Sequence, residues 1–393
     1  MTVTEQHPRL AELTTIGVGG APAHLMTVTT EAELAAVASD VFAAGDEWLL
    51  LGGGSNTVAA DEPFDGTVIR VATRGIEQLG AGAAPQTIRL RVQAGESWDG
   101  LVALAVRSRW SGIEALSGIP GSVGAAPVQN IGAYGQELSS VLVAIDFLDA
   151  ATGERRRIES SELGLGYRTS VLKRGLAGVV IAVELDLIDQ GGLPGAAMSA
   201  PIGYVQLADT LGVAVGTSVS LAELRRTVLR LRASKGMVLD PEDPDSRSAG
   251  SFFTNPIVSE SFARSLPADA PRWPVGAEEP DLVAELDTTD AEQSVSIGRL
   301  ADAAVSRSRR AAQSPRLVKL SAAWLIERAG IRRGFALPGS GAAISSKHTL
   351  AIVNREGASA QEIASLAGFL QARVQSEFGV MLQPEPVLVG LEL

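Results

Sequence analysis

A glycine-rich run between Gly112 and Gly135 restricts the possible structures of this chain more than any other feature of its sequence. Its centre reads SGIPGSVGAAPVQNIGAYG, in which glycine recurs at short intervals between small or apolar residues. Glycine tolerates positive φ and lets backbone N–H groups approach an anion closely. No acidic residue lies between Glu114 and Glu137, as a phosphate site requires. The run therefore predicts loops that bind the pyrophosphate of a dinucleotide, with a purely structural glycine-rich loop as the alternative.

The spacing of these glycines excludes the two commonest phosphate-binding loops. The run lacks the Gly-x-Gly-x-x-Gly of Rossmann domains, and the chain contains no Gly-Lys-Ser/Thr of a Walker A loop. Cysteine is absent, which excludes disulfides, thiolate catalysis and iron–sulfur clusters. The histidines are His7, His24 and His348, and they are too scattered to predict a metal site.

Charge and hydropathy predict a cytoplasmic protein. The net charge of -12 argues against binding to nucleic acid or to an anionic membrane. The N-terminus lacks the cationic and apolar regions of a signal peptide, and no apolar run has the length of a membrane span. With 393 residues, of which 46% are hydrophobic, the chain can form one to three domains with packed cores.

Short strands and helices alternate along the chain, which predicts an α+β fold. Hydrophobic patterns predict strands at 48–51, 67–71, 88–92, 141–148, 155–158, 179–187, 350–354 and 386–393. Capping boxes predict helices that begin near residues 30, 220 and 359, and apolar periodicity predicts two more at 98–109 and 322–329. The adjacent Phe252 and Phe253 predict a further buried strand. Composition predicts a surface insertion at 267–316, with an amphipathic helix over 298–313.

Four further segments carry groups that suit a phosphorylated or carboxylated ligand. The stretch from Gly52 to Asn56 follows an apolar strand and offers amides to a phosphate, with an ordinary turn as the alternative. Arg168, beside a tyrosine, suits bidentate recognition of a carboxylate, although a surface arginine would give the same pattern. The other two segments carry the polar residues Ser251 and Glu385. The alternative to a functional Ser251 is a packed strand with a satisfied serine, and the alternative to a functional Glu385 is an ordinary loop carboxylate.

Together these segments resemble the UDP-N-acetylenolpyruvoylglucosamine reductase family, also called UDP-N-acetylmuramate dehydrogenases. The resemblance rests, in chain order, on TIGVGG from Thr15, GGGSN, SGIPGSVGAAPVQNIGAYGQEL, GYRTSVLK, AGSFFTNP, KLSAAWLIERAG and Pro384-Glu385. It spans nearly the whole chain outside residues 267–316. It implies a two-part FAD-binding fold of the vanillyl-alcohol-oxidase type plus a substrate-binding α+β domain, and Tyr204 implies the longer, tyrosine-loop subclass.

The resemblance also implies a reaction and the residues that perform it. NADPH reduces non-covalently bound FAD, and UDP-GlcNAc-enolpyruvate then takes a hydride and a proton to become UDP-N-acetylmuramate for peptidoglycan synthesis. Arg168 is implied as the cation at the substrate carboxylate, Glu385 as its acidic partner and Ser251 as the proton donor. The implied substrate-binding residues are Tyr167, Tyr204, Lys235 and Asn255. The implied FAD-binding residues are Gly52, Gly53, Gly54, Ser55, Asn56, Ser117, Gly118, Ile119, Pro120, Gly121, Gly124, Ala125, Gln129, Asn130, Gly132, Ala133 and Tyr134.

The implied domains are residues 1–75 with 380–393 as the first FAD-binding part, 76–236 as the second, and 237–379 as the substrate-binding domain. We expect a monomer whose partner is the small-molecule substrate, without nucleic acid, membrane or metal. The main alternative is another non-covalent FAD oxidoreductase of the same fold. An oxidase with covalently bound flavin is disfavoured because the glycine loops contain neither His nor Cys. A non-catalytic nucleotide-binding regulator is disfavoured by the candidates at Arg168, Ser251 and Glu385.

Overall fold

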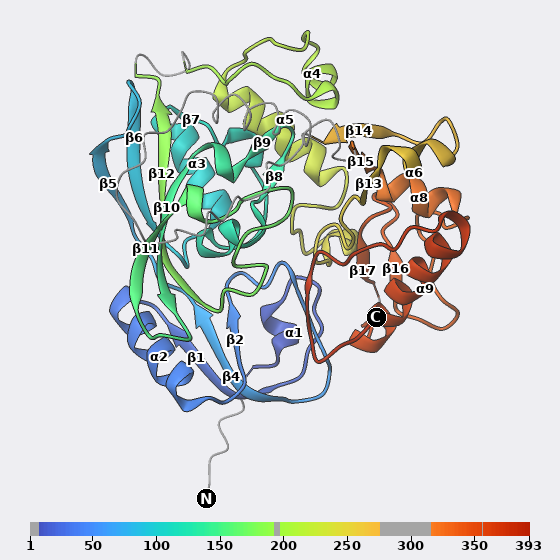
Figure 1. Cartoon of the computed structure of the whole chain (residues 1–393), viewed down its shortest axis with the longest axis horizontal. Coiled ribbons are helices and arrows are strands. Elements are labelled where there is room, and N and C mark those ends of the chain that lie inside the picture. Colours follow the sequence, from blue (N-terminus) through green and yellow to red (C-terminus); the bar gives the residue numbers. More distant parts are fainter. Residues whose placement is uncertain (1–7, 192–196, 276–315, 356) are drawn as a thin grey trace, which may run out of the picture. The chain divides into compact units, whose positions relative to one another are not determined.

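The computed structural model describes residues 8–191, 197–275, 316–355 and 357–393. The chain divides into two compact units, which are coloured along the sequence in Figure 1. Unit 1 consists of Met1–Phe252, Arg332–Phe369 and Pro384–Leu393, and unit 2 consists of Phe253–Ile331 and Leu370–Gln383. The helix predicted at 298–313 lies outside the described residues, and the three predicted domain boundaries stay a prediction.

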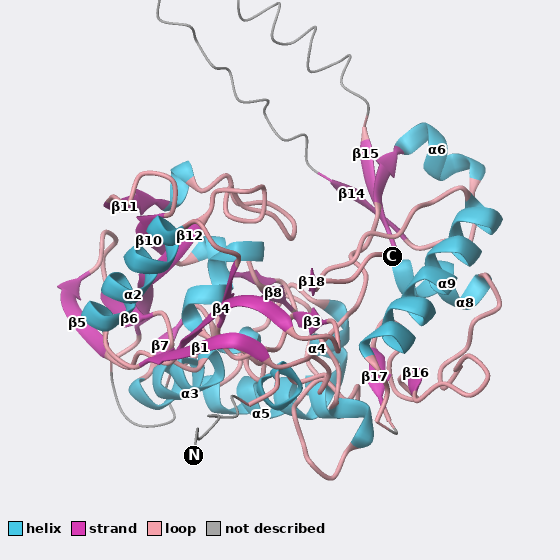
Figure 2. Cartoon of the chain, turned by 90° about the horizontal axis from the view of Figure 1, so that it is seen from below, coloured by secondary structure: helices cyan, strands magenta, loops and turns pink. Residues whose placement is uncertain are grey.

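Unit 1 begins with a small parallel sheet that one helix covers (Figures 1 and 2). Its strands are, in spatial order, β1 (Pro22–Val28), β4 (Phe64–Val71) and β2 (Trp48–Leu51). Helix α2 (Glu31–Ala44) connects β1 to β2 and begins where the Thr30 side chain accepts the N–H of Glu33, as its capping box predicts. Leu34 and Ala38 of α2 are buried in a cluster with Ile69 of β4, which fixes the helix on the sheet.

The C-terminal segment returns to this first part of unit 1. Strand β18 (Val387–Val389) pairs in parallel with β3 (Thr57–Ala59), which directly follows the Gly52–Asn56 loop. The short helix α1 (Leu10–Leu13) packs nearby through the buried Leu10, in a cluster that includes Ala59. The pairing of β18 with β3 places Glu385, two residues before β18, beside the end of the glycine loop.

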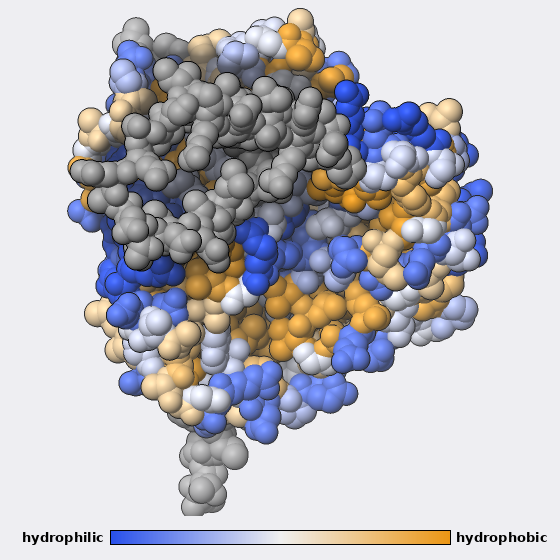
Figure 3. Space-filling view, viewed as in Figure 1, coloured by the Kyte–Doolittle hydropathy of each residue, from blue (hydrophilic) through white to orange (hydrophobic). Residues whose placement is uncertain are grey.

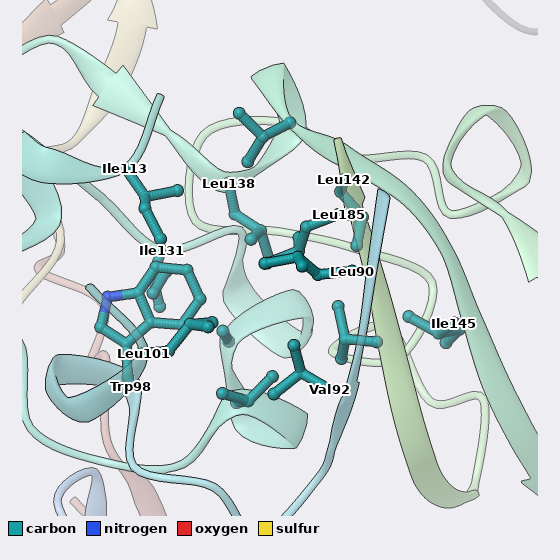
Figure 4. Packing of buried hydrophobic residues seen from close by; sticks show 14 of the residues in the cluster. Leu90, Val92, Trp98, Leu101, Ile113, Ile131, Leu138, Leu142, Ile145 and Leu185 are labelled. Carbon is teal, nitrogen blue, oxygen red and sulfur yellow. The ribbon is translucent and has the colours of Figure 1, made fainter. Parts of the chain in front are cut away.

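A larger antiparallel sheet forms the rest of the unit 1 scaffold. Its strands are, in spatial order, β11 (Arg155–Glu159), β10 (Leu142–Asp149), β12 (Gly178–Asp189), β6 (Thr87–Gln93) and β5 (Ile76–Ala81), with β7 (Trp110–Ser111) paired to β12. Helix α3 (Trp98–Ser108) buries Trp98 and Leu101 in the same core cluster as Leu90 and Val92 of β6 (Figure 4). Each predicted strand of this sheet is confirmed, because period-two hydrophobic patterns are local signals.

Shorter elements complete unit 1. They are the hairpin strands β8 (Gly132–Ala133) and β9 (Gln136–Glu137), helices α4 (Val205–Leu211) and α5 (Leu221–Ala233), and the paired strands β16 (Ala342–Ile344) and β17 (Ile352–Asn354). Helix α5 begins at the predicted capping box, where the Ser220 side chain accepts the N–H of Glu223 at 3.2 Å. Helix α9 (Ala360–Phe378) contributes residues to both units.

Unit 2 has a three-stranded antiparallel sheet of its own. The strands are, in spatial order, β13 (Ile257–Ser259), β15 (Leu317–Leu320) and β14 (Arg272–Val275). Its helices are α6 (Glu260–Ser265), α8 (Ala322–Arg328) and the end of α9, where Trp324 and Phe378 have ring centroids 5.7 Å apart. None of the described helices has the length and hydropathy that crossing a bilayer requires. Hydrophilic side chains are spread over the visible surface of both units, in keeping with the many charged residues of the chain (Figure 3).

The Phe252–Phe253 segment is buried as predicted, but the prediction that it forms a strand is wrong. Phe252 is 1% exposed and lies outside the named strands of the described chain. Its N–H donates to the carbonyl oxygen of Leu350 at 2.7 Å, and its own carbonyl oxygen accepts the N–H of Glu385 at 2.9 Å. One residue thus joins three segments that are distant in sequence, which brings Ser251 and Glu385 together.

Candidate active site

Two loops approach each other closely at the end of β2. Gly52 and Gly53 follow β2 directly, and Gly121 and Ser122 of the glycine-rich run lie against them. A Cβ added at Gly53 would lie 2.8 Å from the Cα of Gly121, and one added at Gly52 would lie 2.3 Å from Ser122 Oγ. Real Cβ atoms do not tolerate such a distance to backbone, so the close approach to Gly121 requires glycine at position 53.

Consecutive backbone N–H groups of these two loops are available to an anion. Within the described parts of the chain, the N–H groups of Gly53, Gly54, Ser55 and Gly121 donate to no protein acceptor. The Ser55 hydroxyl donates to the carbonyl oxygen of Pro120 at 3.1 Å and so holds the loops together. Neighbouring free amides of this kind form an anion-binding nest. The residues present therefore fit the pyrophosphate of FAD, as the sequence predicts.

Other amides of the glycine-rich run already have protein acceptors. The N–H of Gly118 donates to Asp99 Oδ1 at 2.6 Å, that of Ile119 to a carbonyl oxygen at 3.4 Å, and that of Gly124 to the carbonyl oxygen of Ala94 at 2.8 Å. Asp99 is itself held by Arg225, 2.6 Å away. These three amides therefore fix the shape of the loop, and the assignment of Gly118, Ile119 and Gly124 to FAD binding stays a prediction.

A largely apolar cavity of about 340 Å³ adjoins the same loops in unit 1. Gly52, Ser122, Gly124 and Ala125 line one part of it. Most of the other lining residues are apolar side chains of the two sheets and the segment before β12, namely Trp48, Leu50, Val71, Phe147, Leu172, Leu176, Val179 and Val180. Ligand sites of this kind combine apolar walls with a few polar groups that fix orientation. This cavity suits a flat aromatic ring system attached to a phosphate.

Gly53→Ala is expected to reduce the amount of FAD that co-purifies with the protein and to destabilise the fold by about 1–3 kcal/mol. The added methyl group would meet the Cα of Gly121 at 2.8 Å, so the two loops would have to separate. The ratio of flavin to protein absorbance and a thermal melt measure both effects. Gly368→Ala is the matched control, since a Cβ there meets nothing within 4 Å. Equal flavin retention by the two variants would contradict the assignment of this loop.

Arg168 and Glu385, both predicted at the substrate carboxylate, are in contact. Arg168 Nε lies 3.3 Å from Glu385 Oε1, and Arg168 Nη2 donates to the carbonyl oxygen of Gly132 at 3.1 Å. Arg168 has φ 55°, in the left-handed region that side chains with a Cβ rarely adopt. Such a conformation costs of the order of 1–3 kcal/mol and persists only where the surroundings enforce it. The contacts with Glu385 and with the carbonyl oxygen of Gly132 orient the guanidinium.

Three further polar side chains surround Glu385. Gln129 Nε2 donates to Glu385 Oε1 at 3.1 Å, and Asn56 Nδ2 lies 3.3 Å from both Gln129 Oε1 and the Glu385 carbonyl oxygen. Lys173 Nζ donates to that same carbonyl oxygen at 3.1 Å. Asn56 and Gln129 were predicted to bind FAD, and in the structure their side chains connect the glycine loop to Glu385. Sequence reasoning did not single out Lys173, whose only signal is its place in GYRTSVLK.

Burial determines the electrostatics of this cluster. Glu385 is 8% exposed, and burial raises the pKa of its carboxyl above the usual value against the opposing effects of Arg168, Lys173 and Gln129. Burial likewise lowers the pKa of the Lys173 ammonium, although the charge of Glu385 opposes this change. The Glu385 carboxyl therefore takes up a proton more readily than an exposed glutamate does.

Ser251, the predicted proton donor, faces a histidine that sequence reasoning set aside. Ser251 Oγ lies 3.4 Å from His348 Nε2. The two residues meet because the Ser251 segment runs beside β17, with Ser248 bridged to Val353. His348 is a lone histidine in the sequence, and such a residue gives no pattern from which a contact 97 residues away could be predicted.

Three predicted ligand-binding residues come together at the β8–β9 hairpin. Its turn is Tyr134-Gly135, with φ 50° and 86°, as a two-residue hairpin turn of this type requires. The rings of Tyr134 and Tyr204 meet edge to face with centroids 5.6 Å apart, and Lys235 Nζ lies 5.8 Å from the centre of the Tyr134 ring. Lys235 also donates to Gln206 Oε1 at 3.1 Å. The pKa of Lys235 is lowered by burial and, secondarily, by the charge of Arg232.

Two further predicted residues, Asn130 and Asn255, make structural hydrogen bonds. The buried Asn130 side chain donates to Glu137 and to the carbonyl oxygen of Gly166, both at 3.1 Å, so it supports the turn that carries Tyr167 and Arg168. Asn255 belongs to unit 2, where its Oδ1 accepts the N–H of Ala322 at 3.0 Å at the start of α8.

Arg232 of α5 is buried, although an arginine on a helix usually lies in solvent. It is only 9% exposed, and its Nε has no hydrogen-bond partner in the described structure. Burial lowers its pKa, and an added Cβ at Gly118 would lie 3.4 Å from this Nε. Arg232 therefore brings a buried positive charge against the glycine-rich run.

The free amides, the adjoining cavity and the buried cations are features of a dinucleotide-binding flavoprotein, and comparison with known proteins assigns this class. Residues 22–159 match the model of the FAD binding domain, and residues 241–389 match that of the UDP-N-acetylenolpyruvoylglucosamine reductase, C-terminal domain. The predicted α+β fold with an FAD-binding domain is thereby confirmed, and its assignment to the vanillyl-alcohol-oxidase type stays a prediction.

Full-length relatives identify the family. The chain is 61% identical to UDP-N-acetylenolpyruvoylglucosamine reductase of Leifsonia xyli over 98% of its own length and 99% of the relative's. It is 45% identical to that of Saccharopolyspora erythraea, with 98% and 95% covered. The crystal structure of the Thermus caldophilus enzyme matches with a TM-score of 0.55 and 25% identity over 97% of both chains. The chain belongs to the UDP-N-acetylenolpyruvoylglucosamine reductase family, and it is an FAD-dependent oxidoreductase.

Proposed function

We propose that Arg168, Glu385 and Ser251 carry out the reduction of UDP-GlcNAc-enolpyruvate to UDP-N-acetylmuramate, with NADPH as the source of electrons. The observation that carries this proposal is the meeting of the three segments in unit 1. Arg168 contacts Glu385 at 3.3 Å, and the carbonyl oxygen of Phe252, next to Ser251, accepts the N–H of Glu385 at 2.9 Å. Bound FAD supplies the hydride for the vinyl CH2 carbon of the substrate.

Arg168 and Glu385 stabilise the charge that hydride addition creates. As the new C–H bond forms, an electron pair moves into the substrate carboxylate, which becomes an enediolate. A fixed cation in a buried site stabilises such charge more strongly than solvent does, because no reorganisation is needed. Arg168 is already oriented by Gly132 and Glu385. The raised pKa of Glu385 favours a protonated carboxyl, which can donate a hydrogen bond to the enediolate oxygen.

Ser251 delivers the proton that completes the reduction. The enediolate carbon is a strong base, so a weakly acidic hydroxyl suffices when it is correctly placed. The Ser251 O–H bond breaks as the second C–H bond forms at the carbon next to the carboxylate. Hydride and proton together account for the two hydrogens that the product gains.

The nucleotide and sugar of the substrate bind outside this cluster. Lys235 suits a phosphate because its charge is half-buried and lies beside the two tyrosine rings of the hairpin region. Tyr204 and Tyr167 complete the proposed substrate-binding set within unit 1. The protein acts as a cytoplasmic monomer that binds no nucleic acid, in keeping with its net charge of -12. Light scattering after size exclusion tests the oligomeric state.

An anaerobic visible spectrum of the purified protein tests the proposed reaction. The oxidised protein is expected to be yellow, NADPH is expected to bleach it, and the enolpyruvyl substrate is expected to restore the colour. Restoration by substrate is the informative step, because any NADPH-dependent flavoprotein shows the first two. A bleached protein that ignores the substrate would refute the proposal.

Lys173→Met is expected to raise the pKa of Glu385 further, because burial is then opposed by one cation fewer. The protonated carboxyl binds the substrate carboxylate, so affinity is present below the Glu385 pKa and is lost as pH rises through it. In the variant this loss moves to higher pH. Substrate Kd measured against pH shows the shift, and Lys173→Arg, which keeps the charge, should leave the curve near its wild-type position. A shift to lower pH in Lys173→Met would contradict this account.

A further inference from the structure

The contact between Ser251 and His348 is produced by a backbone arrangement on both sides of it. The N–H of Phe252 donates to the carbonyl oxygen of Leu350 at 2.7 Å, and the N–H of Asn354 donates to that of Arg247 at 3.0 Å. The two segments therefore run side by side with Ser251 opposite His348. Ser251 Oγ and His348 Nε2 lie 3.4 Å apart. Hydrogen bonds at catalytic groups are commonly long before substrate binds and shorten in the complex.

The turn that carries His348 is fixed from within. Ser345 is completely buried, and its Oγ accepts the N–H groups of Lys347 at 3.0 Å and of His348 at 3.2 Å. The N–H of Ser345 donates to the carbonyl oxygen of Ala351 at 2.9 Å. These bonds set the backbone direction at His348, so the imidazole is presented to Ser251 by a shaped turn.

A buried carboxylate holds the same turn from outside. Asp245 is 4% exposed, and it accepts the N–H of Ser346 at 3.0 Å, the Ser346 hydroxyl, and Arg355 Nη2 at 3.1 Å. Burial alone would raise the pKa of Asp245, but the hydrogen bonds from Ser346 and Arg355 outweigh it and lower the pKa, so this carboxylate is ionised. Three donors offset the energetic cost of burying this charge, and because two of them belong to Ser346 they tie the turn to the segment before Ser251.

We propose that His348 is a positioning residue that donates its Nε2–H to Ser251 Oγ during protonation of the substrate. This inference rests on the proposed role of Ser251. If the imidazole donates, the serine hydrogen is left to face the reacting carbon. Negative charge then develops on Oγ as its proton leaves, and the Nε2–H stabilises that charge in the same way as an oxyanion-hole donor. Oγ then takes up a proton from solvent, which is the one proton that the overall reduction consumes, and the imidazole keeps its Nε2–H, so both groups are restored.

The test compares the two half-reactions of the FAD-loaded enzyme by rapid mixing. His348→Leu is expected to slow reoxidation of the reduced enzyme by substrate about 10²-fold, the size of effect found for a single oxyanion donor, and to leave reduction by NADPH unchanged. His348→Gln, which retains an N–H donor, is expected to recover at least about a tenth of the wild-type rate. His24→Leu, at an exposed histidine of β1, is the matched control.

A double variant separates this role from a structural one. Because His348 acts through Ser251, Ser251→Ala with His348→Leu should be no slower than Ser251→Ala alone. Multiplied losses in the double variant, or a wild-type rate in His348→Leu, would overturn the inference. A wild-type rate in Ser251→Ala would instead refute the proposed function, so the two failures are distinguishable.

Two further measurements keep the inference testable if His348→Leu folds poorly. Asp245→Asn weakens the hold of Asp245 on the turn without altering His348. It is expected to slow reoxidation of the reduced enzyme by substrate, and this slowing must be absent when Ser251→Ala is also present. In protein labelled with ¹⁵N-histidine, the His348 Nε2 signal should be that of a protonated ring nitrogen. An unprotonated Nε2 that accepts from Ser251 would overturn the assignment.

Discussion

Arg168→Lys is expected to slow transfer of hydride to the substrate by about 10²–10³-fold, as the loss of a fixed charge-stabilising donor does. In the native protein one planar guanidinium donates to Gly132 and faces Glu385 at the same time. A lysine ammonium is a point charge on a flexible stem and cannot reproduce this fork. The charge is conserved by the substitution, so the loss measures geometry. Single-turnover reoxidation of the reduced enzyme by substrate provides the rate.

Reduction by NADPH should be affected much less in Arg168→Lys, because the developing enediolate belongs only to the second half-reaction. Arg70→Lys, at an exposed position of β4, is the control for the substitution itself. A wild-type rate of reoxidation in Arg168→Lys would show that the cation at the substrate carboxylate is another group. Lys173 would then be the first candidate, because its ammonium lies beside the backbone of Glu385.

Ser251→Ala is expected to leave reduction by NADPH nearly intact and to slow reoxidation by substrate about 10²–10⁴-fold, the usual range for a general acid. The hydroxyl is the only group that the substitution removes, and no proton is needed while the flavin is being reduced. The contrast between the two half-reactions is therefore the diagnostic measurement. Ser261→Ala, at an exposed serine of α6, serves as the matched control.

Equal slowing of both half-reactions in Ser251→Ala would argue for a disturbed cofactor site. The backbone beside Ser251 makes that outcome testable, because Phe252 bonds to both Leu350 and Glu385. A thermal melt and the flavin content of the variant detect such a disturbance independently of the rates.

The sequence predicts the scaffold well because the signals for strands and caps are local. Thr30 and Ser220 begin α2 and α5 as their capping boxes indicate. The strands predicted at 88–92, 141–148, 155–158 and 179–187 lie in the large sheet as β6, β10, β11 and β12, whereas β5 and β7 were not predicted. The Phe252 segment is the instructive exception. Its burial was predicted from its residue types, but its hydrogen bonds go to two segments about 100 residues or more away, and no local pattern contains that information.

The site was predictable only in part for the same reason. Arg168, Ser251 and Glu385 follow from the family resemblance, whereas periodicity and spacing alone left each of them open. Gln129 was expected to bind FAD, and its bond to Glu385 spans 256 residues of sequence. His348 and Lys173 carry no motif of their own. Within the glycine-rich run, residue type could not tell free amides from those that bond to Asp99 or Ala94, because that depends on neighbours elsewhere in the chain.

The pairing of β18 with β3 has a consequence for the order in which the molecule can be assembled. Asn56, at the end of the glycine loop, is 329 residues from the Glu385 carbonyl oxygen near it. During synthesis on the ribosome, β3 therefore emerges long before the strand that covers its edge. An exposed strand edge readily pairs with other chains, so the first part of the molecule needs protection until translation reaches its partner. Because Glu385 arrives with β18, the enzyme acquires its proposed catalytic carboxyl in the same late step that closes this edge.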